Sequence, residues 1–483
     1  MIAKPKCGML LSFHEEALMP QQSPNTILSR CLSALGLTDE AFERLRITGT
    51  DSLLSCFPVT DLAVASIGAA GLAVADLMAA LEQTVRVEAD RRLASLWFDF
   101  TIAPQGWELP NAWDAIAGDY AARDGWIKLH TNAPHHKKAV LSVLGCAPER
   151  DAVAAAVAGL SAQELETVIV AAGGCAAVLR SHSEWQEHPQ GRAVIAEPLV
   201  RWEEVNSNNP SEWRPSADRP LAGLRVLDLT RVLAGPVATR FLAGFGAEVL
   251  RIDPPDWDEP AVVPDVTLGK RCAQLDLRRQ FDREVFEHLL SEADVLVHGY
   301  RRDALDAMGY GSAARQTIRP GLIDVSLNAY GHSGPWANRR GFDSLVQLSS
   351  GIAAAGMVWR SADRPVSLPV QALDHATGYL MAAAVIRGVR ARLSGSTQLK
   401  ARLSLARTAE LLFAARGEPT TADFSPAAST DYASDPEITP WGLARRLQPP
   451  LQLSTCAMHW DRPAQKLGSA HARWGEGLVG GSA

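Results

Sequence analysis

The segment from residue 224 to 255 limits the possible folds more than any other part of the sequence. Residues 226–229 form an apolar run typical of a buried strand, Ala234-Gly-Pro reads as a turn, and a helix (237–245) and a second strand (248–252) follow. Further strands are predicted over 273–277, 295–298 and 322–326, with a helix over 282–292. Strands that alternate with helices indicate a parallel sheet covered on both faces, so we expect an α/β fold with a Rossmann-like, doubly wound parallel sheet.

The rest of the chain divides around this domain. We predict a helical N-terminal region (1–105), a small α+β domain (106–200), a Pro- and Asn-rich linker (201–221), the Rossmann-like domain (222–415) and an extended C-terminal tail (416–483). Within the first two parts, a Gly/Ala-rich helix is expected over 63–81. The capping-box pattern Ser161-Ala-Gln-Glu164 is expected to start a second helix that reaches residue 172.

Composition argues against several classes of protein. The net charge of −7 disfavours nonspecific nucleic-acid binding, which needs a basic surface. The seven cysteines include no Cys-x-x-Cys pair, so no metal site is expected, and an odd, scattered set fits reduced thiols in the cytoplasm. No N-terminal signal stands out, because charged residues at 14–16 interrupt the first apolar run. The weakly charged runs 62–80 and 368–386 are predicted to be buried helices, so no membrane span is expected.

Asp374 has the setting that points most directly to chemistry. It follows a loop containing Pro365 and Pro369 and opens a helix of small residues predicted over 376–389. Taken alone, an Asp at this place is interpreted as an N-terminal helix cap. Its position downstream of a nucleotide-type fold favours a different interpretation, a carboxylate nucleophile for covalent acyl chemistry.

The sequence also contains a weak internal repeat. Phe57-Pro-Val-Thr-Asp61 precedes one small-residue helix, and residues 368–374 precede another. Asp61 lies 37 residues before Phe98, and Asp374 lies 39 residues before Phe413. Both copies place an Asp at a helix entrance. Only the second copy follows a complete nucleotide-type half, so Asp61 is interpreted as a relic.

Basic residues gather near the predicted strand ends. The turn at Ala234 follows the first strand, at the edge where open α/β sheets bind ligands and helix N-termini attract phosphate. It lacks a Gly-x-Gly-x-x-Gly pattern, so a dinucleotide is not indicated. Each basic residue alone reads as a solvated surface side chain, but together they favour a phosphate-rich ligand. They are Lys270, Arg271, Arg301, Arg302, Arg339 and Arg340.

In combination these segments resemble the family III CoA-transferases, the group of formyl-CoA and carnitine CoA-transferases and α-methylacyl-CoA racemase. The resemblance covers 222–413, through LDLTRVLAGPVATRFLAGFGAEVLRID (227–253), GKRCAQLDLR (269–278), ADVLVHGYRRDALDAMGYG (293–311), LIDVSLNAYGHSGPWANRRGFDSL (322–345) and LPVQALDHATG (368–378). Residues 118–200 resemble the small domain of the same family, which here precedes the nucleotide-type half instead of following it. The chain therefore looks like a fusion or permutation, the end of one copy followed by the beginning of another.

The resemblance implies a mechanism and its substrates. Asp374 matches the family's nucleophile, which attacks an acyl-CoA thioester to form a mixed anhydride and then an aspartyl-CoA thioester, and so passes CoA to a carboxylic acid acceptor. Coenzyme A, bound as acyl-CoA, is the implied cofactor, without a metal. The residues implied to contact CoA are Val232, Leu233, Ala234, Lys270, Arg271, Tyr300 and Arg340. Family members are interlocked dimers, which implies a homodimer whose small domain closes the site within one chain or across the dimer.

Departures from the family pattern keep alternatives open. Asp343 matches an acidic position near the family's active site, but for Asp343 and Tyr300 structural packing is the alternative interpretation. Leu233 and Pro254 replace residues of the formyl-CoA transferases, which weakens an oxalate or formate assignment. Phe342 stands where the racemases carry a catalytic His, and Phe cannot exchange a proton.

The predicted function is therefore an acyl-CoA:carboxylate CoA-transferase. The first alternative is a CoA-dependent racemase or lyase on the same fold; His375 adjoins Asp374 but is expected to point elsewhere on the helix. The second alternative is a non-catalytic CoA-binding pseudoenzyme, because the family's Gly-rich shielding loop has no counterpart after residue 413. The acyl group and the acceptor are left open by the sequence.

Overall fold

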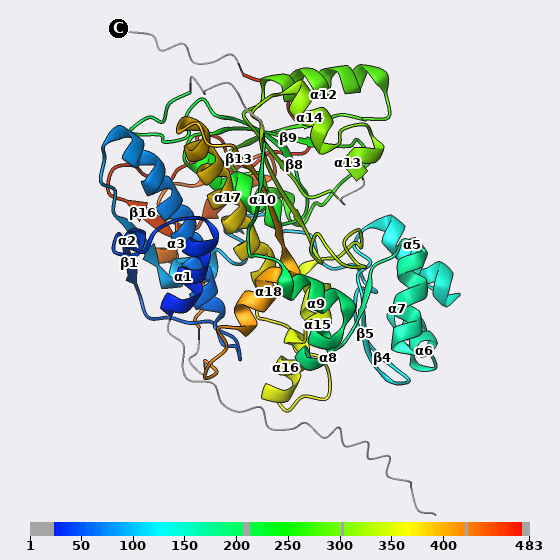
Figure 1. The fold of residues 1–483 in the computed structure, drawn as a ribbon. Coiled ribbons are helices and arrows are strands. Elements are labelled where there is room, and N and C mark those ends of the chain that lie inside the picture. The colour runs from blue at the N-terminus through cyan, green and yellow to red at the C-terminus, as the bar shows by residue number, and fades with distance from the viewer. Residues whose placement is uncertain (1–23, 206–212, 301–303, 421–423, 476–483) are drawn as a thin grey trace, which may run out of the picture.

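A seven-stranded sheet forms the centre of the protein, in the order β10-β9-β8-β11-β12-β13-β7 (Figure 1). The computed structural model describes residues 24–205, 213–300, 304–420 and 424–475. β8 to β13 are parallel, and β7 is antiparallel to β13 at the edge. Counted from β8, the parallel strands follow the Rossmann order 3-2-1-4-5-6, so the predicted doubly wound α/β fold is confirmed. The strands are β7 (Arg201–Glu204), β8 (Arg225–Leu229), β9 (Glu248–Asp253), β10 (Lys270–Gln274), β11 (Val295–His298), β12 (Ile323–Asn328) and β13 (Gln398–Ser404).

Helices cover both faces of this sheet, as Figure 1 shows. α10 (Ala234–Gly244) and α17 (Ala372–Leu393) pack against each other in a core that includes Val226 and Val295. α12 (Gln280–Glu292), α13 (Ala304–Ala307) and α14 (Ser312–Ile318) cover the opposite face of the sheet. The core on this face includes Leu227 and Leu296. Consecutive strand residues thus enter opposite cores, because side chains alternate along a strand. The remaining helices of this half are α11 (Val263–Val266), α15 (Asp343–Ser349), α16 (Ile352–Trp359) and α18 (Leu405–Phe413).

Several element boundaries differ from those predicted. α10 begins at Ala234 instead of residue 237, so the predicted turn Ala234-Gly-Pro is the first turn of this helix. β10 begins at Lys270 instead of residue 273, because the Lys270 ammonium finds a buried counterion, Asp228, at 3.1 Å. α17 begins at Ala372 instead of residue 376, because another residue, Asp343, caps its first N–H groups. Residues 201–204, assigned to the linker, form the edge strand β7; residues 206–212 of that linker lie outside the described residues.

The small domain has its own sheet and its own core. β4 (Gly118–Ala122), β5 (Gly125–Leu129) and β6 (Ala176–Val178) are antiparallel and carry α5 (Pro134–Leu144), α6 (Arg150–Ala158) and α7 (Ala162–Ala171). The core includes Tyr120 and Ile127. α7 begins where predicted, but its capping box is absent: the Ser161 side chain makes no cap hydrogen bond. α8 (His182–Glu187) and α9 (Pro189–Ala196) then lead back to the central sheet.

The N-terminal region confirms the internal repeat as a structural repeat. α3 (Val59–Met78), β2 (Val87–Asp90) and α4 (Arg91–Leu96) have the same order as α17, β13 and α18. The residues before the two helices have nearly the same backbone angles, φ −76° and ψ 64° at Pro58 and φ −77° and ψ 63° at Gln371. α3 packs along α17, so the two copies face each other. The preceding elements are α1 (Pro24–Ala34), α2 (Asp39–Phe42) and β1 (Leu45–Thr48).

The segment Val59–Leu81, formed by α3 and a 3₁₀ turn (Ala79–Leu81), is long and apolar enough to cross a membrane by length and composition. Its most apolar window is 89% buried inside the protein, against α1 and α17. Apolar side chains around the whole of a helix are equally typical of a core helix. The prediction of a buried helix here is therefore confirmed.

The tail wraps around both halves of the molecule. β16 (Leu451–Leu453) pairs with β2, while β14 (Glu437–Thr439) and β15 (Gly442–Arg446) extend a sheet with β3 (Ile102–Pro104). Beyond them, the Trp460 indole stacks on Trp97 of the N-terminal region at 5.4 Å and donates a hydrogen bond to Arg240 of α10 at 2.8 Å. The tail thus fixes the N-terminal copy against the Rossmann-like domain.

Candidate active site

A cavity of 570 Å³ lies at the carboxyl ends of β8, β11 and β12. Strand order reverses between β8 and β11, and open α/β sheets bind ligands at such a switch point. The sequence-predicted residues Val232, Leu233, Ala234, Tyr300, Arg340 and Asp374 all line this main cavity. The small domain of the same chain contributes to its wall, because His135 and His136 of α5 also line it.

Asp374 is the third residue of α17, and its side chain reaches the main cavity. Four residues further along the helix, a Cβ at Gly378 would lie 2.4 Å from the Ala234 carbonyl oxygen. Gly378 therefore lets α17 pack directly on the start of α10, and residues four apart share one face of a helix. This close approach places Asp374 beside the loop at 232–234. Asp374 itself is only 6% exposed.

Asp343, at the start of α15, supports Asp374. Its Oδ2 accepts hydrogen bonds from the N–H groups of Leu373 and Asp374, both at 2.9 Å, and its Oδ1 accepts one from Gln347. Burial raises the pKa of Asp343 to about 6, although these donors oppose the shift. Burial and the charge of Asp343 together raise the pKa of Asp374 well above its usual range. Two buried carboxyl groups this close titrate as a pair, and one holds a proton at acidic pH.

The loop before α10 is held in a strained conformation. Val232 has a φ of 64°, which is uncommon for a β-branched residue and persists only when neighbours enforce it. Its N–H donates to the Glu259 carboxylate at 2.9 Å, and Glu259 is itself held by the buried Arg251 at 2.5 Å. Glu259 thus fixes the shape of the loop that lines the main cavity.

Guanidinium groups supply positive charge to the cavity wall. Arg231 lies between two rings, 4.6 Å from Trp257 and 5.2 Å from Tyr300, and donates to the Tyr300 hydroxyl at 2.9 Å. Arg340 donates to the Gly173 carbonyl of the small domain at 3.2 Å. Arg339 is engaged in the small domain, because it contacts Glu166 at 3.0 Å and donates to the Ala176 carbonyl at 2.7 Å. Arg231 and Arg340 are therefore the guanidinium groups best placed to meet an anionic substrate.

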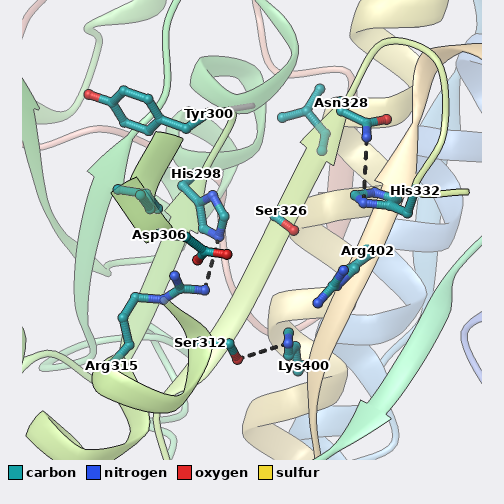
Figure 2. Close-up of a pocket in the computed structure, with 12 residues that line it drawn as sticks. His298, Tyr300, Asp306, Ser312, Arg315, Ser326, Asn328, His332, Lys400 and Arg402 are labelled. Atoms are coloured by element: carbon teal, nitrogen blue, oxygen red, sulfur yellow. Dashed lines mark hydrogen bonds between the residues drawn. The ribbon is translucent and has the colours of Figure 1, made fainter. Parts of the chain in front are cut away.

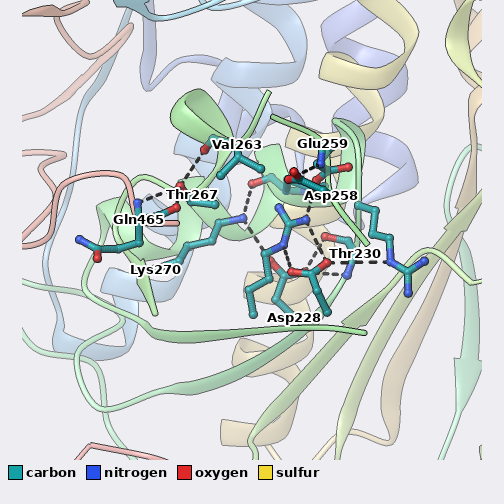
Figure 3. A network of polar contacts seen from close by, with 12 residues as sticks. Asp228, Thr230, Asp258, Glu259, Val263, Thr267, Lys270 and Gln465 are labelled. Carbon is teal, nitrogen blue, oxygen red and sulfur yellow. Dashed lines mark hydrogen bonds and ion pairs between the residues drawn. The ribbon is translucent and has the colours of Figure 1, made fainter. Parts of the chain in front are cut away.

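Lys270 and Arg271 do not join this group. Lys270 is fully buried between Asp228 and the Pro236 carbonyl oxygen, at 3.1 and 3.0 Å (Figure 3). Arg271 pairs with Glu248 at 3.2 Å. Both stand at the amino end of β10, whereas the main cavity lies at the carboxyl edge of the sheet. The predicted basic turn is therefore part of a strand, and the structure does not bring it to the cavity. Arg301 and Arg302 lie outside the described residues.

Sequence reasoning missed the histidines of the small domain. His135 and His136 line the main cavity, and Phe342 lies between His130, stacked at 3.8 Å, and His136, whose ring centre is 5.8 Å away. Burial and neighbouring positive charge lower the pKa of His136 to about 4, and the same causes lower the pKa of His135. Both are therefore neutral at pH 7. The run His135-His136 in the sequence was the available signal. His375 does point away, as predicted, and stacks on Phe98 at 5.2 Å.

The first copy of the repeat has no comparable site. Asp61 is also the third residue of its helix, but Arg91 holds its carboxylate at 2.7 Å. Arg91 is the first residue of α4, and Leu405 is the first residue of α18 in the second copy. Leu405 lines the main cavity and leaves Asp374 without a cationic partner. The described residues hold no group of three or more His, Cys, Asp or Glu that could bind a metal ion.

The sequence profile of CoA-transferase family III matches residues 221–434. The matched residues, which make up less than half of the chain, are therefore similar to that family. Over 294 residues the chain is 29% identical to an acyl-CoA transferase of Gibberella moniliformis, covering 55% of this chain and 51% of that protein. It is 35% identical over 206 residues to the acetyl-coenzyme A transferase nodX of Hypoxylon pulicicidum, covering 40% of this chain and 35% of that protein.

Among solved structures, Rv3272 from Mycobacterium tuberculosis is 30% identical, with a TM-score of 0.38, over 43% of this chain and 57% of that one. The chain thus spans between about a third and a half of the curated relatives named above. The family match covers the Rossmann-like domain that carries Asp374, Asp343 and the loop at 232–234, so it concerns the same residues that form the main cavity.

Proposed function

We propose that this protein is an acyl-CoA:carboxylate CoA-transferase and that Asp374 is its nucleophile. The observation that carries the proposal is the Asp374 carboxylate, which has no cationic partner in the described structure and lies at the wall of a mainly apolar cavity at the carboxyl edge of a Rossmann-like sheet. A structural carboxylate is normally neutralised, as Asp61 is by Arg91. A carboxylate that attacks a carbonyl carbon needs a free oxygen, so it should not be held in an ion pair of this kind.

In the proposed reaction, an Asp374 oxygen attacks the thioester carbonyl carbon, the carbon–sulfur bond breaks, and CoA thiolate leaves behind a mixed anhydride. The thiolate then attacks the aspartyl carbonyl carbon, which releases the donor acid and forms an aspartyl-CoA thioester. The acceptor carboxylate attacks this thioester, and the returning thiolate takes the acceptor's acyl group from the new anhydride. Asp374 is regenerated, and no net proton is consumed.

Two features of the site suit this chemistry. The first N–H groups of α10, at Ala234 and Gly235, belong to a helix start at the cavity wall, where orphan donors and the helix dipole can stabilise an oxyanion. The small domain contributes His135 and His136 and helps to exclude water, which would hydrolyse an anhydride. We propose that the CoA phosphates meet Arg231 and Arg340, since Lys270 and Arg271 lie elsewhere.

A second candidate function is supported by one specific observation. A CoA-dependent racemase needs an acid/base group beside Asp374. Phe342 cannot fill that role, but His135 and His136 line the same cavity and are neutral at pH 7. In this alternative, one of them takes the α-proton of the acyl group. Exchange of that proton for deuterium from the solvent would favour the racemase, and a transferase would leave it in place.

Trapping of the intermediate tests the main proposal. The protein is incubated with a panel of acyl-CoA donors and then with hydroxylamine, which converts an activated Asp374 carbonyl to a hydroxamate that peptide mass spectrometry locates. We expect the hydroxamate at Asp374 only with an accepted donor. Neither Asp374→Asn nor a donor-free sample should give it. If no donor in a broad panel yields the adduct while acyl-CoA still binds, the protein is a CoA-binding pseudoenzyme.

We further propose a cytoplasmic homodimer, on the basis of the family resemblance and the pattern of cysteine use. The small domain of the same chain already contributes His135 and His136 to the main cavity, and a partner would add to this wall. Sedimentation of the active protein measures the oligomeric state, and a fully active monomer would contradict the dimer. Cell fractionation measures the location.

A further inference from the structure

A second, smaller cavity of 150 Å³ adjoins the main cavity, and residues of α13 and α14 contribute to its wall. Figure 2 shows the residues that line it. The two cavities share Tyr300, Leu327 and Asn328. The proposed reaction uses none of the remaining groups that line this side cavity. Its floor consists of strands β11, β12 and β13.

The floor of the side cavity departs from the pattern of the rest of the sheet face. On β8 and β11 this face carries Leu227 and Leu296 in a packed core. Towards the edge the same face carries Ser326 of β12, and Lys400 and Arg402 of β13. Burying polar groups against a sheet costs free energy unless they have partners. A sequence that breaks its own apolar pattern in one place commonly does so for function.

The charges around the side cavity are unevenly satisfied. Three cations line it, Arg315, Lys400 and Arg402, against one carboxylate, Asp306. Arg315 is fully engaged by Asp324, with contacts of 3.0 and 2.5 Å.

Lys400 and Arg402 share a single carboxylate outside the cavity lining, Glu203 of β7, at 2.8 and 3.0 Å. The Arg201 guanidinium is a third cation near the same carboxylate, at 3.7 Å. One carboxylate therefore faces three cations at this edge of the sheet.

The two histidines of the side cavity, His298 and His332, both lie near the positive charge of Arg402. His298 contacts Asp324 at 3.1 Å through Nε2, and His332 contacts the Leu403 carbonyl oxygen at 3.0 Å through Nε2. Burial lowers the pKa of each ring, and the charge of Arg402 lowers both further. The pKa of His332 falls to about 4. Both rings are therefore neutral at pH 7 and leave the positive charge of the cavity to Lys400 and Arg402.

We propose that the side cavity binds a compact oxyanion, a carboxylate or a phosphate group, between Lys400 and Arg402. The Lys400 ammonium has three N–H donors and meets Ser312 and Glu203 with two of them, at 2.8 Å each. The Arg402 guanidinium meets Glu203 through Nε and Nη2, and Nη1 is the donor assigned to the ligand. The Ser326 hydroxyl lines the same space. Ligand pockets for larger molecules start at roughly 300 Å³, so a small anion fits this volume better.

Two substitutions with opposite expected effects test this proposal. Calorimetric titration of the full-length protein with acetate, inorganic phosphate and neutral acetamide, at constant ionic strength, measures the dissociation constants. Arg402→Gln should weaken anion binding by about tenfold or more, the usual effect of losing a charge-assisted hydrogen bond. Glu203→Gln should strengthen binding, because it frees two cations. Arg271→Gln, which changes a guanidinium outside both cavities, should leave this binding unchanged, and Arg402→Lys should retain much of it.

The three ligands separate the sources of an anion. Preference for acetate assigns a carboxylate, and preference for phosphate assigns a phosphate group. Acetamide should not bind, since it has the shape of acetate without the charge. The proposal is overturned if acetamide binds as tightly as acetate, if Glu203→Gln and Arg402→Gln shift the affinity in the same direction, or if Arg271→Gln abolishes the signal as well. Thermal melts of each variant confirm that the fold is retained.

Discussion

The buried pair of carboxyl groups, Asp343 and Asp374, should lower the free energy of unfolding of the protein when both are ionised. Asp374→Asn removes one of two adjacent buried carboxyl groups and leaves a side chain of nearly the same shape. We expect this variant to lose transferase activity and to become more stable than the wild type at pH 8. Ordinary buried polar substitutions destabilise, so a gain would indicate the removal of a carboxylate whose charged form is disfavoured by burial and by the charge of Asp343.

The size of the effect follows from the raised pKa values. The pKa of Asp343 rises from 3.8 to about 6, which is about two units, and each unit corresponds to about 1.4 kcal/mol. Ionising this group in the fold thus costs on the order of 3 kcal/mol, and the pKa of Asp374 is raised as well. The folded state keeps protons that the unfolded chain has lost, so stability falls as the pH rises from about 4 through 6 and above. Because the pKa of Asp374 is also raised, Asp374→Asn should be more stable than the wild type at pH 8 and nearly equal to it at pH 4.

Denaturant unfolding of wild type and variant at pH 4, 6 and 8 measures this difference. Asp61→Asn is the matched control, since Asp61 occupies the same helix position but pairs with Arg91 at 2.7 Å. Losing that partly buried ion pair should destabilise the protein by about 0.5–1 kcal/mol at pH 8, the opposite sign. The reasoning would be refuted if Asp374→Asn were less stable than the wild type at pH 8, or if its gain were the same at pH 4.

Three further predictions concern kinetics. Asp343→Asn should lower the pKa of Asp374 and move the rising limb of the pH–kcat/KM profile to lower pH. If the limb does not move, the charge of Asp343 does not control the pKa of Asp374. Arg340→Gln should raise the KM for acyl-CoA by about tenfold, while the matched change Arg271→Gln should not, and equal effects would contradict the placement of the phosphates. Glu259→Gln should release the strained Val232 loop and raise the KM for acyl-CoA more than it lowers kcat, whereas a loss in kcat alone would argue against this positioning role.

Most of the parallel sheet was predictable because short runs rich in Val, Leu and Ile alternate with helical segments. β13 was not predicted, and its sequence carries Lys400 and Arg402. The strand at 295–298 was predicted with its observed bounds. The start of β10 was predicted three residues too late because a Lys at that position is typical of a turn. Only the tertiary structure shows that Asp228 is buried beside Lys270 and pairs with it. β7 was missed because an edge strand that pairs in antiparallel fashion with a distant segment leaves little local pattern in a Pro- and Asn-rich region.

The main cavity was predictable where its residues belong to one local motif. Asp374 and the loop at 232–234 were found because each belongs to a short segment at a strand or helix end. His135 and His136 were not, since they reach the cavity only through the folding of a separate domain onto the sheet. Glu259 was missed for the same reason, because its contact with the Val232 N–H joins positions 27 residues apart.

The repeat shows how one contact decides whether a carboxylate is structural or reactive. Asp61 and Asp374 begin from the same place: third in a long helix of small residues, after a residue with nearly the same backbone angles. In the first copy the following short helix begins with Arg91, and the carboxylate becomes half of an ion pair. In the second copy the same position is Leu405, and the carboxylate faces a cavity and another carboxylate. Local sequence sets the position of both Asp residues, but the charge of a residue roughly 30 positions away sets what each can do.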